Sequence, residues 1–180
     1  MILYAITDPS ILSFETLSSD LHRIKARGAS MILYRDKKTA EYEKRAERFV
    51  EAAKEAGFGK IILHNTPQLA LRLGAWGVHC SSDAYGLISE GKRLGLKTVA
   101  STHSLEEIKK AEEAGADMVT LSPLFVSPGK GKPLGEKGFT RIVQEAKVPM
   151  IALGGITDKE KIRRAMSCGA SGIASIRYFA

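Results

Sequence analysis

The sequence predicts an α/β protein of one domain, residues 1–180, whose parallel strands close into a (βα)8 barrel, the TIM-barrel architecture. Two observations favour this fold: short apolar runs alternate with longer segments of helical period, and a Gly-Ala pair stands directly before every second run. A third observation concerns the final segment. Only residues 177–180 follow the last apolar run, so we expect the eighth helix to be missing or truncated.

The expected strands are short apolar runs rich in β-branched residues. They cover residues 2–7, 30–35, 60–64, 77–80, 98–101, 118–122, 149–153 and 172–176. Strands this continuously apolar need cover on both faces, and parallel strands need crossovers of about a dozen residues or more. A parallel sheet with helices packed outside it is therefore expected.

Seven helical patterns lie between these runs, at residues 14–26, 39–55, 67–73, 86–94, 104–114, 139–146 and 158–167. The Gly-Ala pairs begin at residues 28, 74, 115 and 169. Glycine adopts the left-handed backbone conformation that ends a helix without steric cost, and alanine keeps the turn small. This regular spacing favours a closed barrel over an open sheet. Without an eighth helix, apolar wall between the first and last strands would be exposed, so we expect a homo-oligomer.

Composition excludes several classes of protein. The chain has 27 basic and 20 acidic residues, for a net charge of +7, but most of its lysines and arginines alternate with glutamates on expected helix faces. We therefore expect no nucleic acid partner, and no apolar run approaches the length of a membrane-spanning helix. The N-terminus lacks a basic leader, which predicts a cytoplasmic protein. Cys80 and Cys168 are far apart and are expected to be reduced, packed thiols.

Polar residues follow nearly every expected strand, at the end where (βα)8 barrels carry their active sites. They are Arg35 to Lys38, His64 and Asn65, His79 to Asp83, Ser101 to His103, residues 127–135, Gly154 and Gly155, and Arg177. The set is basic and rich in hydroxyl groups, with few acids. It predicts that phosphorylated small molecules bind at this rim.

The segment 127–135 and the Gly154-Gly155 pair carry most of that prediction. Flexible glycines let backbone N–H groups and Lys130 wrap around oxyanions, and two glycines ahead of a helix let a phosphate approach bare backbone. Arg177 is placed to clamp the same phosphate bidentately. A plain surface loop, a tight turn and an exposed tail residue are the structural alternatives. His64 and His79 face either the mouth or the rim, and His103 is either a site residue or a turn residue near a helix cap.

Several of these segments together resemble the thiamine phosphate synthase family, which includes related thiazole tautomerases. Residues 34–37, Tyr-Arg-Asp-Lys, are similar to the family's Gln-Leu-Arg-x-Lys, and residues 122–130 are similar to Gly-Pro-Ile-Phe-x-Thr-x-Thr-Lys. The resemblance extends to residues 74–79, 100–104, 115–117 and 153–156. It covers almost the whole chain, from Tyr4 to Ile176.

This resemblance implies an enzyme that joins hydroxymethylpyrimidine diphosphate to thiazole phosphate and releases diphosphate with the help of Mg2+. It implies that Arg35, Lys37 and Lys130 hold the diphosphate, that Ser101 and Ser127 add hydroxyl contacts, and that Gly154 and Gly155 bind the thiazole phosphate. Lys130, Ser101 and Lys37 are the expected catalytic residues. Further expected substrate contacts are His64, Asn65, His103 and Arg177, and Asp83 is the expected metal ligand.

The chain departs from the family pattern at identifiable positions. Leu33 stands where the family has Gln, Asn65 where it has the acidic half of an Asn-Asp pair, and Gly129 where it has a hydroxyl residue. Two alternatives therefore stand beside the synthase: a thiazole tautomerase-like isomerase and a non-catalytic barrel that binds a phosphate ligand. The tautomerases' Gly-His pair corresponds to Ser122-Pro123 here.

Overall fold

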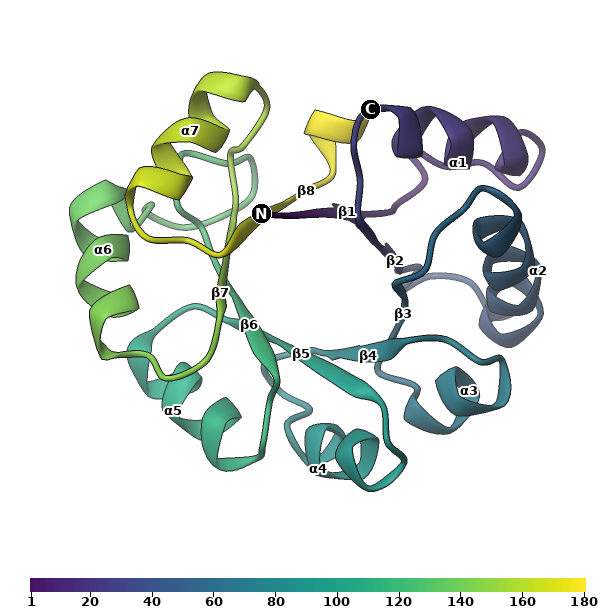
Figure 1. Cartoon of the computed structure of the whole chain (residues 1–180), viewed down its shortest axis with the longest axis horizontal. Coiled ribbons are helices and arrows are strands. Elements are labelled where there is room, and N and C mark those ends of the chain that lie inside the picture. The colour runs from purple at the N-terminus through teal and green to yellow at the C-terminus, as the bar shows by residue number, and fades with distance from the viewer.

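A computed structural model describes residues 1–180 as a closed barrel of eight parallel strands. The elements in chain order are β1 Ile2–Ile6, α1 Leu17–Ala26, β2 Met31–Tyr34, α2 Tyr42–Glu55, β3 Ile61–His64, α3 Pro67–Arg72, β4 Gly77–Cys80, α4 Gly86–Arg93, β5 Lys97–Thr102, α5 Leu105–Glu113, β6 Met118–Leu121, α6 Gly135–Glu145, β7 Met150–Leu153, α7 Lys159–Ser167, β8 Gly172–Ser175 and the 3-10 turn η1 Arg177–Phe179. Figure 1 looks down the barrel, with the helices around the ring of strands. The predicted (βα)8 fold is confirmed.

Strand pairing closes the barrel because β1 pairs with both β2 and β8 in parallel register. Side chains alternate across each strand, so every strand buries two faces. One set fills the barrel interior: Tyr4, Ile6, Met31, Leu33, Ile62, Val99, Ile151 and Ala174. The alternate set packs under the helices in a larger cluster of 40 buried residues. This double burial explains the unbroken apolar runs that predicted a parallel sheet.

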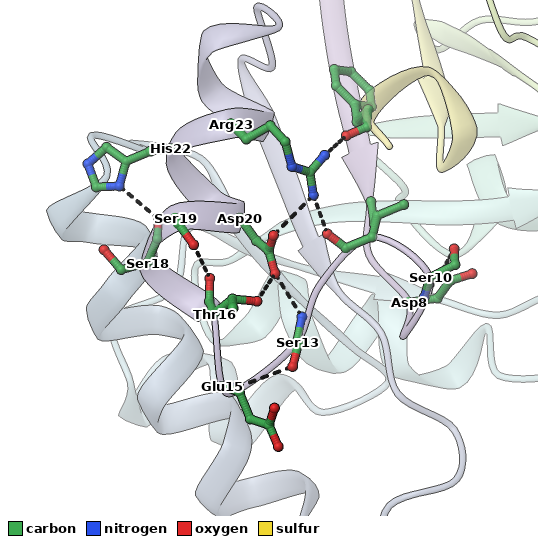
Figure 2. A network of polar contacts seen from close by, with 12 residues as sticks. Asp8, Ser10, Ser13, Glu15, Thr16, Ser18, Ser19, Asp20, His22 and Arg23 are labelled. Atoms are coloured by element: carbon green, nitrogen blue, oxygen red, sulfur yellow. Dashed lines mark hydrogen bonds and ion pairs between the residues drawn. The ribbon is translucent and has the colours of Figure 1, made fainter.

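The exposed wall expected between β1 and β8 is absent, and that prediction was wrong. The turn η1 follows β8 and buries Phe179 completely, and no barrel strand contributes an exposed large apolar side chain. Arg23 of α1 donates to the carbonyl of Phe179 at 2.6 Å and to that of Ile11 at 2.7 Å (Figure 2). Arg27 donates to the carbonyl of Tyr178 at 2.9 Å. The homo-oligomer inferred from an exposed wall stays a prediction.

Most helix boundaries lie within three residues of those predicted, with one larger difference. Helix α6 begins at Gly135, four residues before the expected position 139. Gly138 interrupts the apolar pattern in its first turn, so the sequence signal starts only at Phe139, which is fully buried. None of the helices combines the length and the apolar character needed to cross a lipid bilayer.

Candidate functional site

A cavity of about 480 Å³ opens at the carboxyl ends of the strands, and most of the residues that line it are polar. The predicted site residues that line it are Arg35, Lys37, His64, Ser101, His103, Ser127, Lys130, Gly154, Gly155 and Arg177. They come from strand ends and from the loops that follow them, far apart in the sequence, and the barrel brings these segments to one rim. Asn65 and Asp83 are the two predicted residues that do not line it.

Four cations face this cavity without a carboxylate partner. Arg35 and Lys37 follow β2, Lys130 lies in the loop before α6, and Arg177 opens η1. None of them forms a salt bridge. Asp8 is the one acidic residue in the lining, and it accepts hydrogen bonds from Ser10 N–H at 2.8 Å and Ser10 Oγ–H at 2.5 Å. Unpaired cations around one concave surface attract a polyanion.

The Gly154-Gly155 pair brings the turn after β7 against the loop that carries Lys130. Both residues have positive φ, at 98° and 72°. A Cβ on Gly155 would lie 2.5 Å from the carbonyl oxygen of Val126, so only glycine allows this approach. Neither glycine N–H donates a hydrogen bond within the chain. The turn therefore combines the two interpretations that the sequence left open: it is tightly packed, and its two glycines, with unbonded N–H groups, line the cavity.

Two histidines, His79 buried and His64 partly buried, lie on neighbouring strands, and both are neutral at physiological pH. His79 is 3% exposed, and its burial lowers its pKa to about 3. The pKa of His64 is lowered to about 4, mainly by burial and further by the charges of Arg35 and Lys37. The register of β3 and β4 sets the two histidines side by side, with ring centroids 6.4 Å apart.

His79 contacts Tyr4 on one side and Ser101 on the other. Its Nδ1 lies 2.9 Å from the Tyr4 hydroxyl oxygen, and its Nε2 lies 2.8 Å from Ser101 Oγ. Tyr4 was not among the predicted site residues, and His79 was left open. The alternation along β4 offers a signal for His79, but no local pattern pairs it with Tyr4, which is 75 residues away.

His103 borders the cavity and directly precedes the N-cap of α5, Ser104. Its backbone N–H donates to Glu107 Oε2 at 2.7 Å, and its Nδ1 lies 3.0 Å from the same oxygen. The Ser104 side chain accepts from the Glu107 N–H at the first turn of α5. His103 is thus a turn residue next to the Ser104 helix cap, and it also lines the cavity.

Asn65 and Asp83 build a bridge between two loops instead of entering the cavity. Asn65 Nδ2 donates to Ser81 Oγ at 2.8 Å, and Ser81 N–H donates to Asn65 Oδ1 at 2.9 Å. Ser81 Oγ–H then donates to Asp83 Oδ1 at 2.5 Å. Asn65 adopts a φ of 53°, a conformation that asparagine tolerates better than most residues. The bridge holds Ser81 at the edge of the cavity lining.

The same contacts test whether this region suits Mg2+, which requires oxygen ligands in near-octahedral geometry. The Asn65 amide oxygen already accepts from Ser81, and the one carboxylate nearby, that of Asp83, accepts from Ser81 and lies outside the cavity. No three His, Cys, Asp or Glu residues gather at a spacing that would hold a metal ion. The protein groups therefore do not fit a resident Mg2+ ion.

The fold and the cavity define a (βα)8 barrel whose ligand site suits an anionic, phosphorylated small molecule. A family model described as thiamine monophosphate synthase matches residues 3–179. The chain belongs to this thiamine monophosphate synthase family.

Relatives with known names agree with this assignment. A protein of Aquifex aeolicus, named provisionally as thiamine-phosphate synthase 2, is 35% identical over 98% of this chain and 96% of its own length. The thiamine-phosphate synthase of Syntrophomonas wolfei is 30% identical over 97% of this chain and 86% of its own length. Among solved structures, the thiamine phosphate pyrophosphorylase of Pyrococcus furiosus superposes with a TM-score of 0.81 at 27% identity, covering 97% of this chain and 85% of that chain.

Proposed function

We propose that this protein is a thiamine-phosphate synthase, a transferase that joins hydroxymethylpyrimidine diphosphate to thiazole phosphate. The observation that carries the proposal is the convergence of four unpaired cations on one cavity: Arg35, Lys37, Lys130 and Arg177. Two phosphorylated substrates bring several negative charges to one site, and a cavity with a single acid suits them. Membership of the synthase family supports the same conclusion.

In this reaction the bond between the pyrimidine methylene carbon and the diphosphate oxygen breaks, and its electron pair leaves with the diphosphate. The thiazole nitrogen then forms the new bond to that carbon. Negative charge gathers on the leaving oxygens as the bond breaks, so Arg35, Lys37 and Lys130 stabilise the transition state more than the bound substrate. Catalysis is thus mainly electrostatic, with the two substrates held in contact by the cavity.

The neutral histidines suit the same chemistry. Positive charge develops on the methylene carbon, and a protonated imidazole beside it would oppose this step. Burial keeps the pKa of His64 at about 4 and that of His79 at about 3, so neither ring carries charge at neutral pH. The cations can then act on the diphosphate while the barrel interior stays uncharged.

The phosphate of the thiazole substrate is assigned to the Gly154-Gly155 turn. Two free N–H groups at the start of the segment leading to α7 suit a phosphate, and Arg177 borders the same cavity from η1. This arrangement separates the two anionic groups. The diphosphate faces Arg35, Lys37 and Lys130, and the monophosphate faces the glycine turn.

The direct test supplies both precursors and Mg2+ to the purified protein and measures thiamine phosphate by chromatography. Lys130→Ala should lower kcat about 100-fold or more, the usual cost of removing one oxyanion-stabilising group. Lys132→Ala is the matched control, because Lys132 lies in the same loop but does not line the cavity. We expect it to change kcat less than twofold. Equal effects of the two substitutions would contradict the role given to Lys130.

Two other outcomes would replace the proposal. Isomerisation of a thiazole carboxylate without Mg2+ would identify a tautomerase, and tight binding of thiazole phosphate without turnover would identify a phosphate-binding barrel. Dialysis against a chelator tests the Mg2+ requirement that the family resemblance implies. The cytoplasmic location predicted from the sequence is checked by cell fractionation.

A further inference from the structure

Three hydrogen-bonding side chains run in series from the barrel interior to the cavity. Tyr4 on β1 is fully buried, His79 on β4 is 3% exposed, and Ser101 on β5 lines the cavity. The Tyr4 hydroxyl lies 2.9 Å from His79 Nδ1, and His79 Nε2 lies 2.8 Å from Ser101 Oγ. The three residues come from different strands, so the register of the barrel sets these distances.

The position of one proton on His79 decides the direction of the whole series. If that proton is on Nδ1, it is donated to the Tyr4 oxygen, and the Tyr4 proton is left without an acceptor in a fully buried place. If it is on Nε2, Tyr4 donates to Nδ1 and His79 donates to Ser101 Oγ, so every buried donor has a partner. Buried polar groups are nearly always paired, which selects the second arrangement.

Both buried groups keep the protonation state that this arrangement needs. Burial raises the pKa of Tyr4 well above its usual range, so the phenol keeps its proton and stays a donor. Burial also lowers the pKa of His79 to about 3, so its ring carries one proton across the neutral range and acts as acceptor at one nitrogen and donor at the other.

This direction determines what Ser101 can do. Its Oγ accepts from His79, so its own proton is free to point into the cavity, where Arg35, Lys37 and Lys130 also face. The Tyr85 hydroxyl donates to the Ser101 carbonyl at 2.9 Å and holds the end of the strand. A hydroxyl that already accepts a hydrogen bond donates more strongly, and it needs no reorientation when charge develops.

We propose that Tyr4 and His79 are positioning residues that hold Ser101 as a hydrogen-bond donor to a diphosphate oxygen of the substrate. This inference rests on the proposed synthase function. Neither Tyr4 nor His79 has to exchange a proton with the substrate. Their effect is to exclude the opposite tautomer, in which the Ser101 proton would turn toward His79 Nε2 and away from the cavity.

The tautomer can be measured without any turnover, by long-range 15N–1H NMR of the His79 ring in the intact protein. The wild type should show Nε2 protonated and Nδ1 as an acceptor. Tyr4→Phe removes only the hydroxyl and should produce a mixture of both tautomers. A wild-type ring protonated at Nδ1 would overturn the inference, and this result does not depend on whether the protein is a synthase.

The kinetic test places Tyr4→Phe in the wild type and in a Ser101→Ala background. We expect Tyr4→Phe to lower kcat about tenfold in the wild type with little change in KM. In the wrong His79 tautomer, Ser101 no longer donates to the charge that develops in the transition state, whereas binding of the substrate changes little. In the Ser101→Ala background the same substitution should have no further effect. Independent, multiplying effects would overturn the inference.

Tyr34→Phe is the matched control for both measurements. Tyr34 is 2% exposed, but its hydroxyl has no hydrogen-bond partner and it does not line the cavity that holds Ser101. Its kcat should stay within twofold of the wild type, and the His79 spectrum should not change. A kcat loss for Tyr34→Phe as large as that for Tyr4→Phe would mean that removing any buried hydroxyl disturbs the barrel, which would contradict a specific role for Tyr4.

Discussion

Replacing Arg23 by alanine should loosen the turn that carries Arg177 into the cavity. Arg23 donates to the carbonyls of Phe179 at 2.6 Å and Ile11 at 2.7 Å, and it pairs with Asp20 at 3.3 Å. Figure 2 shows this guanidinium between α1, the loop after β1 and the turn after β8. One side chain thus ties η1 to two other segments.

The expected loss of stability follows from these contacts. A hydrogen bond to a charged group contributes roughly 1.5–3 kcal/mol. The Arg23 side chain is 36% exposed, so water can replace part of what is lost. We expect Arg23→Ala to lower the free energy of unfolding by about 2–3 kcal/mol in total. For a chain of this size that corresponds to a fall in Tm of about 4–12 °C.

Thermal and urea unfolding measure this change, with Arg27→Ala as the matched control. Arg27 lies one turn further along the same segment and makes a single exposed hydrogen bond to the Tyr178 carbonyl, so its loss should cost less than about 1 kcal/mol. In the synthase assay, Arg23→Ala should raise KM for thiazole phosphate more than it lowers kcat. Equal losses of stability in the two variants would refute this account of the turn.

Three further predictions concern the cavity, the histidines and the assembly. Gly155→Ala should lower the free energy of unfolding by about 3 kcal/mol, because the φ of Gly155 is 72° and a Cβ there would meet the Val126 carbonyl. In Gly131→Ala, the control, the added Cβ has no atom within 4 Å, so the loss should be less than about 0.5 kcal/mol. Urea unfolding measures both. The pKa values of His64 and His79 fall from 6.5 to about 4 and about 3 on folding, so the unfolded chain binds protons that the folded chain excludes. Unfolding free energy measured from pH 6.5 to pH 4 should therefore decrease, by up to about 1.4 kcal/mol per pH unit for each histidine, and a flat profile would contradict the burial argument. Light scattering at micromolar concentration tests the homo-oligomer expected from the sequence, and a monomer would contradict that expectation and agree with the covered wall between β1 and β8.

Local features of the chain were enough to predict the order of the elements and the rim that carries the polar residues. Apolar runs, helix caps and Gly-Ala turns are short-range signals, because backbone geometry and burial act over a few residues. Parallel strands also place their carboxyl ends at the same rim. Residues 35, 37, 130 and 177 could therefore be assigned to one cavity before their spacing was known.

The tertiary structure alone decided which side chains meet. Tyr4 reaches His79 because both side chains point into the barrel interior, and Phe179 covers the wall because the last turn packs against α1, whose Arg23 and Arg27 bond its carbonyls. Asn65 was expected in the site, but its amide groups bond Ser81 and hold two loops together. Contacts of this kind depend on strand register and loop packing between distant segments, and a pattern read along the chain contains no information on those distances.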